Sequence, residues 1–277
     1  MIRKALDQYT PGYVYMCQVS EKISCGACCG LYSIENISRK NIDNILNKRS
    51  ILFESVARNI DGLIEYESEI SKLESQVNPY PDFHHCPFVG FMGDKVKTVG
   101  CLLHPLAKGN NGIDYRGISY YGGMACKNYF CLTCKKLTPR YKKIVRCVID
   151  DWYLYGLIVT EWEMLNCLFF EIEHMINREL TAEEIGKSEF LKSGILAFLS
   201  LKIESKLSQN IQANYFFEDQ KYKLPEINYP LYNLEVSKYD VILRCFRFKI
   251  NSASELMKAE TLVKTNIQLI SELIQNI

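Results

Sequence analysis

Apolar residues recur at helical spacing over most of the chain, except in a cysteine-rich stretch. Over residues 38–60 they fall every three or four positions and make one apolar face. Asp61–Gly62 interrupts this stripe, and a second stripe runs over residues 63–77. It ends before two prolines, which cannot continue a helix. The pattern predicts an antiparallel helical hairpin over about residues 38–77.

The periodicity changes after Cys86. The segment "CPFVGFMGDKVKTVGCLLHP", residues 86–105, alternates short apolar runs about Gly93–Asp94, a turn signal flanked by strand-like residues. It predicts a β-hairpin with Cys86 near one end and Cys101 near the other. Residues 109–123 are rich in turn formers and leave room for one further short strand.

After Pro139 the pattern is helical again. Apolar positions over residues 144–175 predict one long helix or two helices joined near Gly156. The segments starting at Thr181 and Ser252 have the Ser/Thr-x-x-Glu form of a capping box and predict two further helix starts. Residues 210–240 have no clear period and predict a surface loop or docking segment.

Together these patterns predict an α+β fold that is mainly α. A cysteine-rich metal-binding domain, containing the β-hairpin and the helical hairpin, is expected over residues 1–139. A helical domain is expected over residues 140–277. An apolar fraction of 48% and a charged fraction of 23% allow a core of ordinary size.

Charge and segment length narrow the classes of partner. The net charge of +1 argues against attraction to nucleic acid or to an anionic membrane. The densest basic stretch, Lys135–Lys143, is interpreted as the solvated start of a helix. No signal-peptide pattern opens the chain, and the longest apolar run, residues 152–160, is far shorter than the ~20 residues that span a bilayer. We expect a cytoplasmic protein with neither a nucleic-acid nor a membrane partner.

Cysteine is the most unusual feature of the composition. The chain has 12 cysteines, which stay reduced in the cytoplasm, so their clustering needs a cause other than disulfides. In a C-x-x-C turn two thiolates face one side of the backbone, where they can bind a metal. The glycines at 26 and 30 are expected to supply positive φ and close approach. The predicted metal ligands are Cys25, Cys28, Cys29, Cys86, Cys101, Cys126, Cys131 and Cys134.

Histidine extends this candidate set. His84, His85 and His104 lie near the cysteines, and imidazole binds zinc well. His104 follows Cys101 at x-x spacing and is the additional candidate ligand.

The remaining cysteines have simpler interpretations. Cys147, Cys167 and Cys245 lie in apolar helical patterns and are expected to be small buried hydrophobes. Cys17 stands alone in the chain. Cys28 and Cys29 cannot point the same way from an extended backbone, so one faces the core or each serves a different metal.

Thiolate-rich sites suit zinc, iron–sulfur clusters or copper(I). Zinc is favoured because paired C-x-x-C turns beside a hairpin are how zinc knuckles are built. The alternative is iron, as a 4Fe-4S cluster. Eight thiols would fit two tetrahedral sites, or one four-iron cluster with one zinc.

The motifs "CGACCG" (residues 25–30), "CPFVGFMGDKVKTVGCLLHP" and "CKNYF" (126–130) resemble the YkgJ-like cysteine-cluster family, the zinc- or iron-chelating domain. The resemblance covers roughly residues 17–134. The family's first cysteine would fall at Glu21, and Cys17 is the nearest cysteine; Cys131 and Cys134 would make up the set. Relatives include flagellin lysine methylases, whose cluster is thought to hold iron–sulfur, which implies a redox or methyl-transfer role.

Two hypotheses follow. In the first, metal stabilises a loop-rich domain while the helical half binds a protein partner. In the second, the metal centre is chemically active. The chain contains no G-x-G-x-x-G and no C-x3-C-x2-C motif, so no nucleotide or S-adenosylmethionine loop is indicated, and the sequence identifies no enzyme activity.

Overall fold

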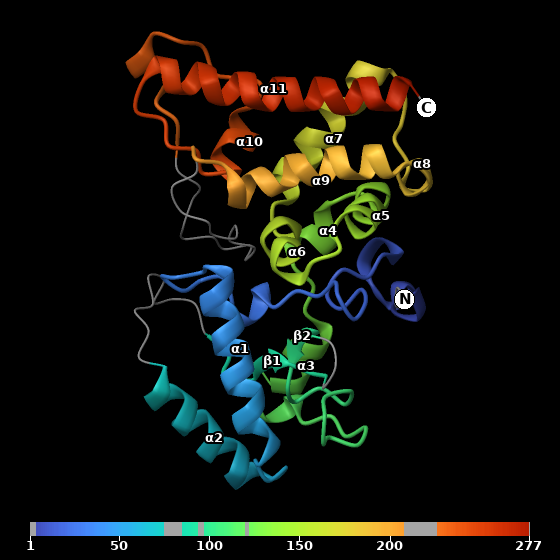
Figure 1. Ribbon diagram of the computed structural model, residues 1–277. Coiled ribbons are helices and arrows are strands. Elements are labelled where there is room, and N and C mark those ends of the chain that lie inside the picture. Colours follow the sequence, from blue (N-terminus) through green and yellow to red (C-terminus); the bar gives the residue numbers. More distant parts are fainter. Residues whose placement is uncertain (1–3, 75–84, 94–96, 120–121, 208–225, 277) are drawn as a thin grey trace.

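The computed structural model describes residues 4–74, 85–93, 97–119, 122–207 and 226–276, with the backbone alone at residues 4, 5 and 123–125. The fold is mainly helical with a two-stranded antiparallel hairpin, which confirms the predicted fold class. Figure 1 shows the C-terminal helices stacked at one end of the molecule and α1, α2 and the β-hairpin at the other. The N-terminal segment crosses between these two parts.

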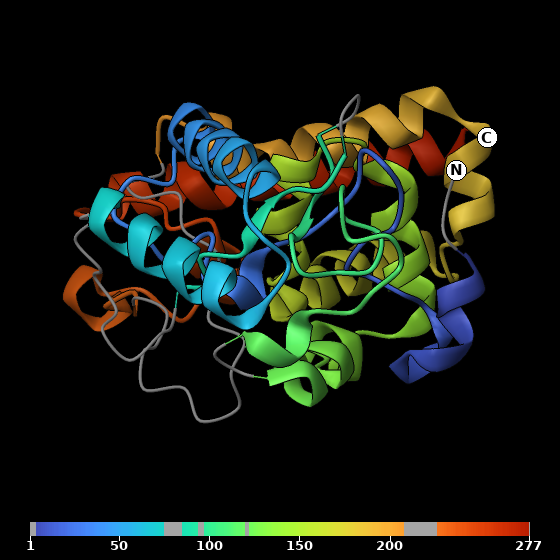
Figure 2. The same ribbon diagram turned by 90° about the horizontal axis from the view of Figure 1, so that it is seen from below.

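The helical hairpin consists of α1 (Arg39–Glu54) and α2 (Ile60–Leu73), which lie side by side in Figures 1 and 2. The predicted interruption at Asp61–Gly62 is wrong, because these residues form the first turn of α2. The Asn59 side chain accepts a hydrogen bond from the Gly62 backbone nitrogen and so caps this helix. The predicted end of the second helix, at residue 77, lies outside the described residues.

The β-hairpin is confirmed. Strand β1 (Val89–Phe91) pairs antiparallel with β2 (Val99–Cys101), with Gly90 opposite Gly100. A further strand is absent from the described part of residues 109–123. That stretch forms turns, the 3-10 helix η4 (Arg116–Ile118) and the start of α3 (Gly122–Asn128).

Three helices follow Pro139 where one or two were predicted. They are α5 (Pro139–Val148), α6 (Trp152–Val159) and α7 (Trp162–Ile176). The chain breaks before α6 because Asp151 caps that helix through two backbone N–H groups. The predicted joint at Gly156 is wrong: this glycine lies inside α6, where the ring of Tyr32 packs against it.

The other helices are α4 (Leu132–Lys136), α8 (Ala182–Lys187), α9 (Glu189–Glu204), α10 (Asp240–Cys245) and α11 (Ala253–Gln275). Thr181 forms the predicted capping box with Glu184. Ser252 caps α11 as expected, while the Glu255 carboxylate accepts from the neighbouring Asn251 nitrogen. The described part of the predicted 210–240 loop contains the short helix η5 (Tyr229–Tyr232).

The hydrophobic core crosses residue 139. The largest cluster joins the C-terminal helices to four residues of the N-terminal segment, and a second joins α1 and the β-hairpin to α6. The division into domains at residue 139 stays a prediction. Cys245 is fully buried in the largest cluster, and Cys147 and Cys167 pack half-buried against it, as small hydrophobes would.

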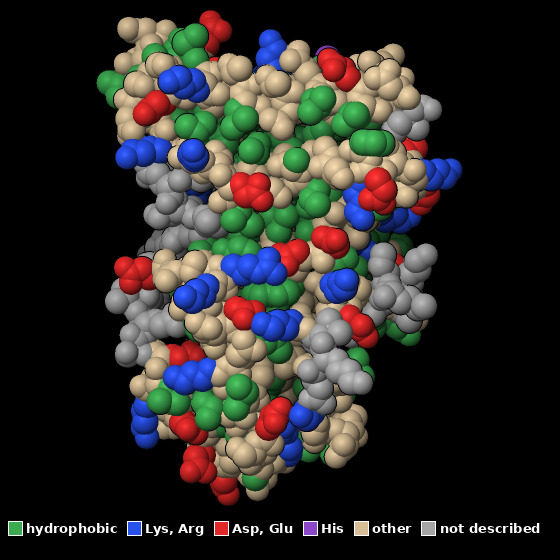
Figure 3. Space-filling view, viewed as in Figure 1, with side chains coloured by type: hydrophobic (Ala, Val, Ile, Leu, Met, Phe, Trp, Pro, Cys, Tyr) green, Lys and Arg blue, Asp and Glu red, His purple; other side chains and the backbone are tan. Residues whose placement is uncertain are grey.

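On the face in Figure 3, Lys and Arg are interspersed with Asp and Glu, so no large area carries one sign of charge. Among the described residues, no helix combines the length and the apolar composition needed to cross a membrane.

Gly156→Ala should destabilise the fold by about 1–3 kcal/mol, because a Cβ there would overlap the Tyr32 hydroxyl and ring. Tyr32 is 1% exposed and has little room to move. The free energy of unfolding in urea measures this. Gly186→Ala in α8 is the matched control, since the nearest atom, Cys147 Sγ, would lie 3.6 Å from the new Cβ. Equal stability of the two variants would contradict the packing described here.

Candidate metal centre

Cys17 and Cys25 face each other across a short turn. Residues 18 and 24 form an isolated antiparallel bridge, and the Cys25 nitrogen donates to the Cys17 carbonyl oxygen at 2.8 Å. The Ser20 hydroxyl accepts two backbone N–H groups inside the turn and closes it. This turn places a cysteine that stands alone in the sequence beside the first C-x-x-C motif.

The Cys28–Cys29 pair lies on a single 3-10 turn, η3 (Ala27–Cys29), and not on extended backbone. The premise of an extended backbone is therefore wrong, and the two thiols interact with each other; the prediction that each serves a different metal stays open. Cys29 also hydrogen-bonds with Cys86, and the Cys86 nitrogen donates to the Cys29 carbonyl oxygen at 3.0 Å.

The two glycines of this motif have different roles. Gly30 ends the turn with a φ of 78°, in the left-handed region that favours glycine. Gly26 has a φ of −118°, so positive φ was wrongly expected there. Close approach is its role, because a Cβ would lie within 2.9–3.2 Å of Leu31, Val99 and Val89.

The second C-x-x-C motif begins α4. Cys131 is its N-cap, and the Cys131 thiol donates to Cys134 Sγ at 4.0 Å. Two sulfurs bound to one tetrahedral zinc, each about 2.3 Å from it, lie roughly 3.8 Å apart. The Cys134 thiol in turn interacts with the Cys17 thiol, which helps to raise the pKa of Cys134. We call Cys17, Cys25, Cys131 and Cys134 the first thiol group.

The other sulfurs gather around Cys86. Cys29 contacts it, Cys101 and Cys126 interact with it electrostatically, and Cys126 Sγ lies 3.2 Å from the Ser119 hydroxyl. We call Cys29, Cys86, Cys101 and Cys126 the second thiol group. Cys28 interacts with members of both groups and lies between them.

These interactions connect the eight cysteines predicted as ligands and also Cys17, which was not predicted. The signal that could have found it is the seven-residue spacing to Cys25 around a serine-containing turn. The predicted histidine ligand has another contact: His104 Nδ1 accepts from the Leu106 backbone nitrogen at 3.1 Å. His84 lies outside the described residues.

Burial makes most of these thiols hard to ionise. It raises the pKa of Cys25 well above the ordinary value and that of Cys101 to about 12. The hydrogen bond that Cys131 makes to Cys134, together with burial, raises the pKa of Cys131 well above the ordinary value. By contrast, the hydrogen bond from Cys29 lowers the pKa of Cys28. Thiolates at these positions would need a nearby positive charge.

One pair of these sulfurs, Cys131 and Cys134, makes a sulfur–sulfur hydrogen bond, while Cys25 and Cys126 hydrogen-bond with the Ala27 nitrogen and the Ser119 hydroxyl. All twelve cysteines are free, and none forms a disulfide. No group of three or more His, Cys, Asp or Glu side chains in the described ranges is arranged so that it could hold a metal ion. Metal binding at either thiol group is accordingly a hypothesis.

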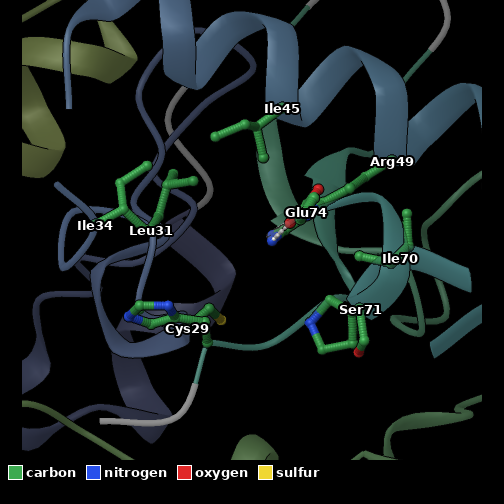
Figure 4. Close-up of a pocket in the computed structure, with 11 residues that line it drawn as sticks. Cys29, Leu31, Ile34, Ile45, Arg49, Ile70, Ser71 and Glu74 are labelled. Carbon is green, nitrogen blue, oxygen red and sulfur yellow. Dashed lines mark hydrogen bonds and ion pairs between the residues drawn. The ribbon is translucent and has the colours of Figure 1, made fainter. Parts of the chain in front are cut away.

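A cavity of about 210 Å³ adjoins Cys29 (Figure 4). Leu31 and Ile34 line one side, and the Arg49–Glu74 ion pair lies across from them at 2.5 Å. Arg49 also donates to the Cys86 carbonyl oxygen at 3.0 Å. One buried guanidinium therefore links α1, the residue after α2 and the backbone of a second-group cysteine.

One lysine of the basic stretch is not solvated. Lys135, Lys136 and Lys143 are exposed as predicted, but Lys142 is 1% exposed, so the prediction is wrong at this position. The Lys142 ammonium donates to the carbonyl oxygens of Pro11 at 2.8 Å and Cys134 at 2.5 Å. It thus ties the N-terminal segment to the second C-x-x-C motif.

Comparison with known proteins finds no match for this chain among family models, curated proteins or solved structures. The resemblance to the YkgJ-like family therefore has the cysteine motifs as its support and stays a prediction.

Ser24→Ala should lower the free energy of unfolding by about 1–3 kcal/mol. The fully buried Ser24 hydroxyl accepts from the Val99 nitrogen at 2.9 Å and joins the first cysteine turn to the strand that carries Cys101. Alanine would leave this N–H buried without an acceptor. Urea unfolding measures the loss, with Ser193→Ala, exposed on α9, as the control. A loss no greater than that of the control would show that this hydrogen bond does not anchor the turn.

Proposed function

We propose that this protein binds metal ions through thiolates at the two thiol groups, with zinc as the favoured metal. One observation carries the proposal. Nine thiols from three separate stretches, residues 17–29, 86–101 and 126–134, gather in one region while all remain free. Cysteines that only fill the core need not lie beside other cysteines: the ionisable groups that act on Cys147, Cys167 and Cys245 are carboxylates and lysines, not thiols.

The first thiol group has the donor set of a structural zinc site. Its four members, Cys17, Cys25, Cys131 and Cys134, would be the ligands, and four thiolates with no open position are typical of zinc that stabilises a fold. The Cys131–Cys134 separation of 4.0 Å is close to that of two ligands on one zinc.

The second thiol group offers four more sulfurs, with Cys28 between the groups as a fifth. The structure around this group contains little regular secondary structure. The two strands have three residues each, and the chain from 102 to 119 is mostly turns. A metal at this position would hold three loop segments together, which is the role of metal in many small loop-rich domains.

Iron is the alternative metal. Four cysteines also hold a 4Fe-4S cluster, which would give the protein a redox or methyl-transfer role. The family resemblance of the cysteine motifs supports this alternative. Either metal requires reduced thiols, so we also propose a reducing compartment, the cytoplasm, as the location.

Elemental analysis of protein purified without oxygen tests the proposal. We expect about two zinc per chain and no visible absorbance, because two sets of four thiols are available. Cys17→Ser should lower the content by about one zinc, whereas Cys167→Ser, on α7 and outside both groups, should not. About four iron with acid-labile sulfide would favour the alternative. Absence of metal from every preparation would refute the proposal.

Zinc binding should release protons and strengthen as pH rises. The bound form needs thiolates, and the raised pKa values of Cys25, Cys101 and Cys131 keep these groups protonated near neutral pH. Protons therefore still compete with zinc for these thiols at pH values above about 8.5, the ordinary pKa of cysteine. Calorimetry in buffers of different ionisation enthalpy counts the protons. Binding without proton release between about pH 6 and pH 8 would contradict thiolate ligation.

A further inference from the structure

Lys142 carries a charge into the interior beside the first thiol group. Its side chain is 1% exposed, and its ammonium contacts the Cys134 and Pro11 carbonyl oxygens. Two carbonyl dipoles replace only part of the hydration that an ammonium loses on burial. A buried charge of this kind is expected to have a counter-ion close by.

The other buried cations of the described chain have carboxylate partners. Lys202 pairs with Glu161, and Arg146, one turn after Lys142 on α5, pairs with Asp7 at 2.8 Å. Arg49 is paired with Glu74 in the same way.

Lys142 is different. Among the described residues no carboxylate pairs with it, and the ionisable groups that act on its ammonium are the thiols of Cys134 and Cys131. The negative charge suited to this ammonium is therefore that of the thiol group itself. Neutral thiols do not supply it, whereas four thiolates around a divalent cation carry a net charge of minus two.

We propose that Lys142 is the counter-ion of a metal–thiolate centre at the first thiol group. This inference rests on the proposed function and assigns a role to a residue outside the ligand set. Lys142 acts through Cys134 as a positioning residue and offsets half of the centre's excess charge. The buried ammonium thus stabilises a metal centre of net negative charge at the first group. Removing this ammonium weakens metal binding at the first group and leaves metal binding at the second group unchanged.

The test is a competition titration with zinc alone against a chromophoric chelator. Lys142→Gln keeps N–H donors and removes the charge, and Lys142→Met removes both. Each should weaken zinc binding at the first group by about tenfold to a hundredfold, the usual effect of losing a partner around a metal ligand. Lys143→Met, at the next and exposed position of α5, is the matched control and should bind like the wild type.

A double-mutant comparison locates the effect. In a Cys17→Ser background, where the first group has lost one ligand, Lys142→Gln should cause no further loss of tight zinc binding. A further loss equal to that in the wild-type background would place the effect at the second group and overturn the inference.

Three other results would also overturn it. Unchanged zinc affinity in both Lys142 variants would mean that the charge of the Lys142 ammonium does not contribute to zinc binding. Weakening by Met without weakening by Gln would mean that the hydrogen bonds matter and the charge does not. Unfolding of both variants without zinc would show a structural role that precedes metal. Failure of the wild type to bind zinc would instead refute the proposed function.

Discussion

The position of residues 14–37 between the two parts of the molecule is the constraint on which the rest of the structure depends (Figure 1). Buried hydrogen bonds hold this segment in place. The hydroxyls of Tyr155 and Tyr153 donate to the carbonyl oxygens of Met16 and Ile37, each at 2.7 Å. Tyr32 lies against Gly156 of the same helix. Because the segment carries Cys17 to Cys29, this packing sets which other cysteines those thiols can meet.

Charge connects this packing to the proposed metal chemistry. Burial and crowding raise the pKa of most thiols in the two groups, so a negative charge there needs compensation from a cation. The structure supplies the Lys142 ammonium at the first group and the Arg116 guanidinium at the second, and a bound metal would supply the rest. The two explain each other at the first thiol group: the ammonium has no carboxylate partner among the described residues, and the ionisable groups that act on it are the thiols of Cys134 and Cys131.

Local pattern was sufficient for the features that depend on neighbouring residues. Helical spacing predicted the helical hairpin, turn signals predicted the β-hairpin, and the Thr181 capping box was correct. Features set by distant contacts were missed. Gly156 looked like a joint because its partner, Tyr32, is far away in sequence, and Lys142 looked solvated because the segment covering it is N-terminal. Cys17 looked isolated because its contact with Cys134 arises from tertiary packing.

X-ray absorption at the zinc edge of the isolated protein tests the central claim most directly, because it reports the atoms bound to the metal. Thiolate ligation at the two groups predicts a first shell of about four sulfurs near 2.3 Å. A shell made of nitrogen and oxygen alone would show that any metal present binds elsewhere and that the gathered thiols have another purpose.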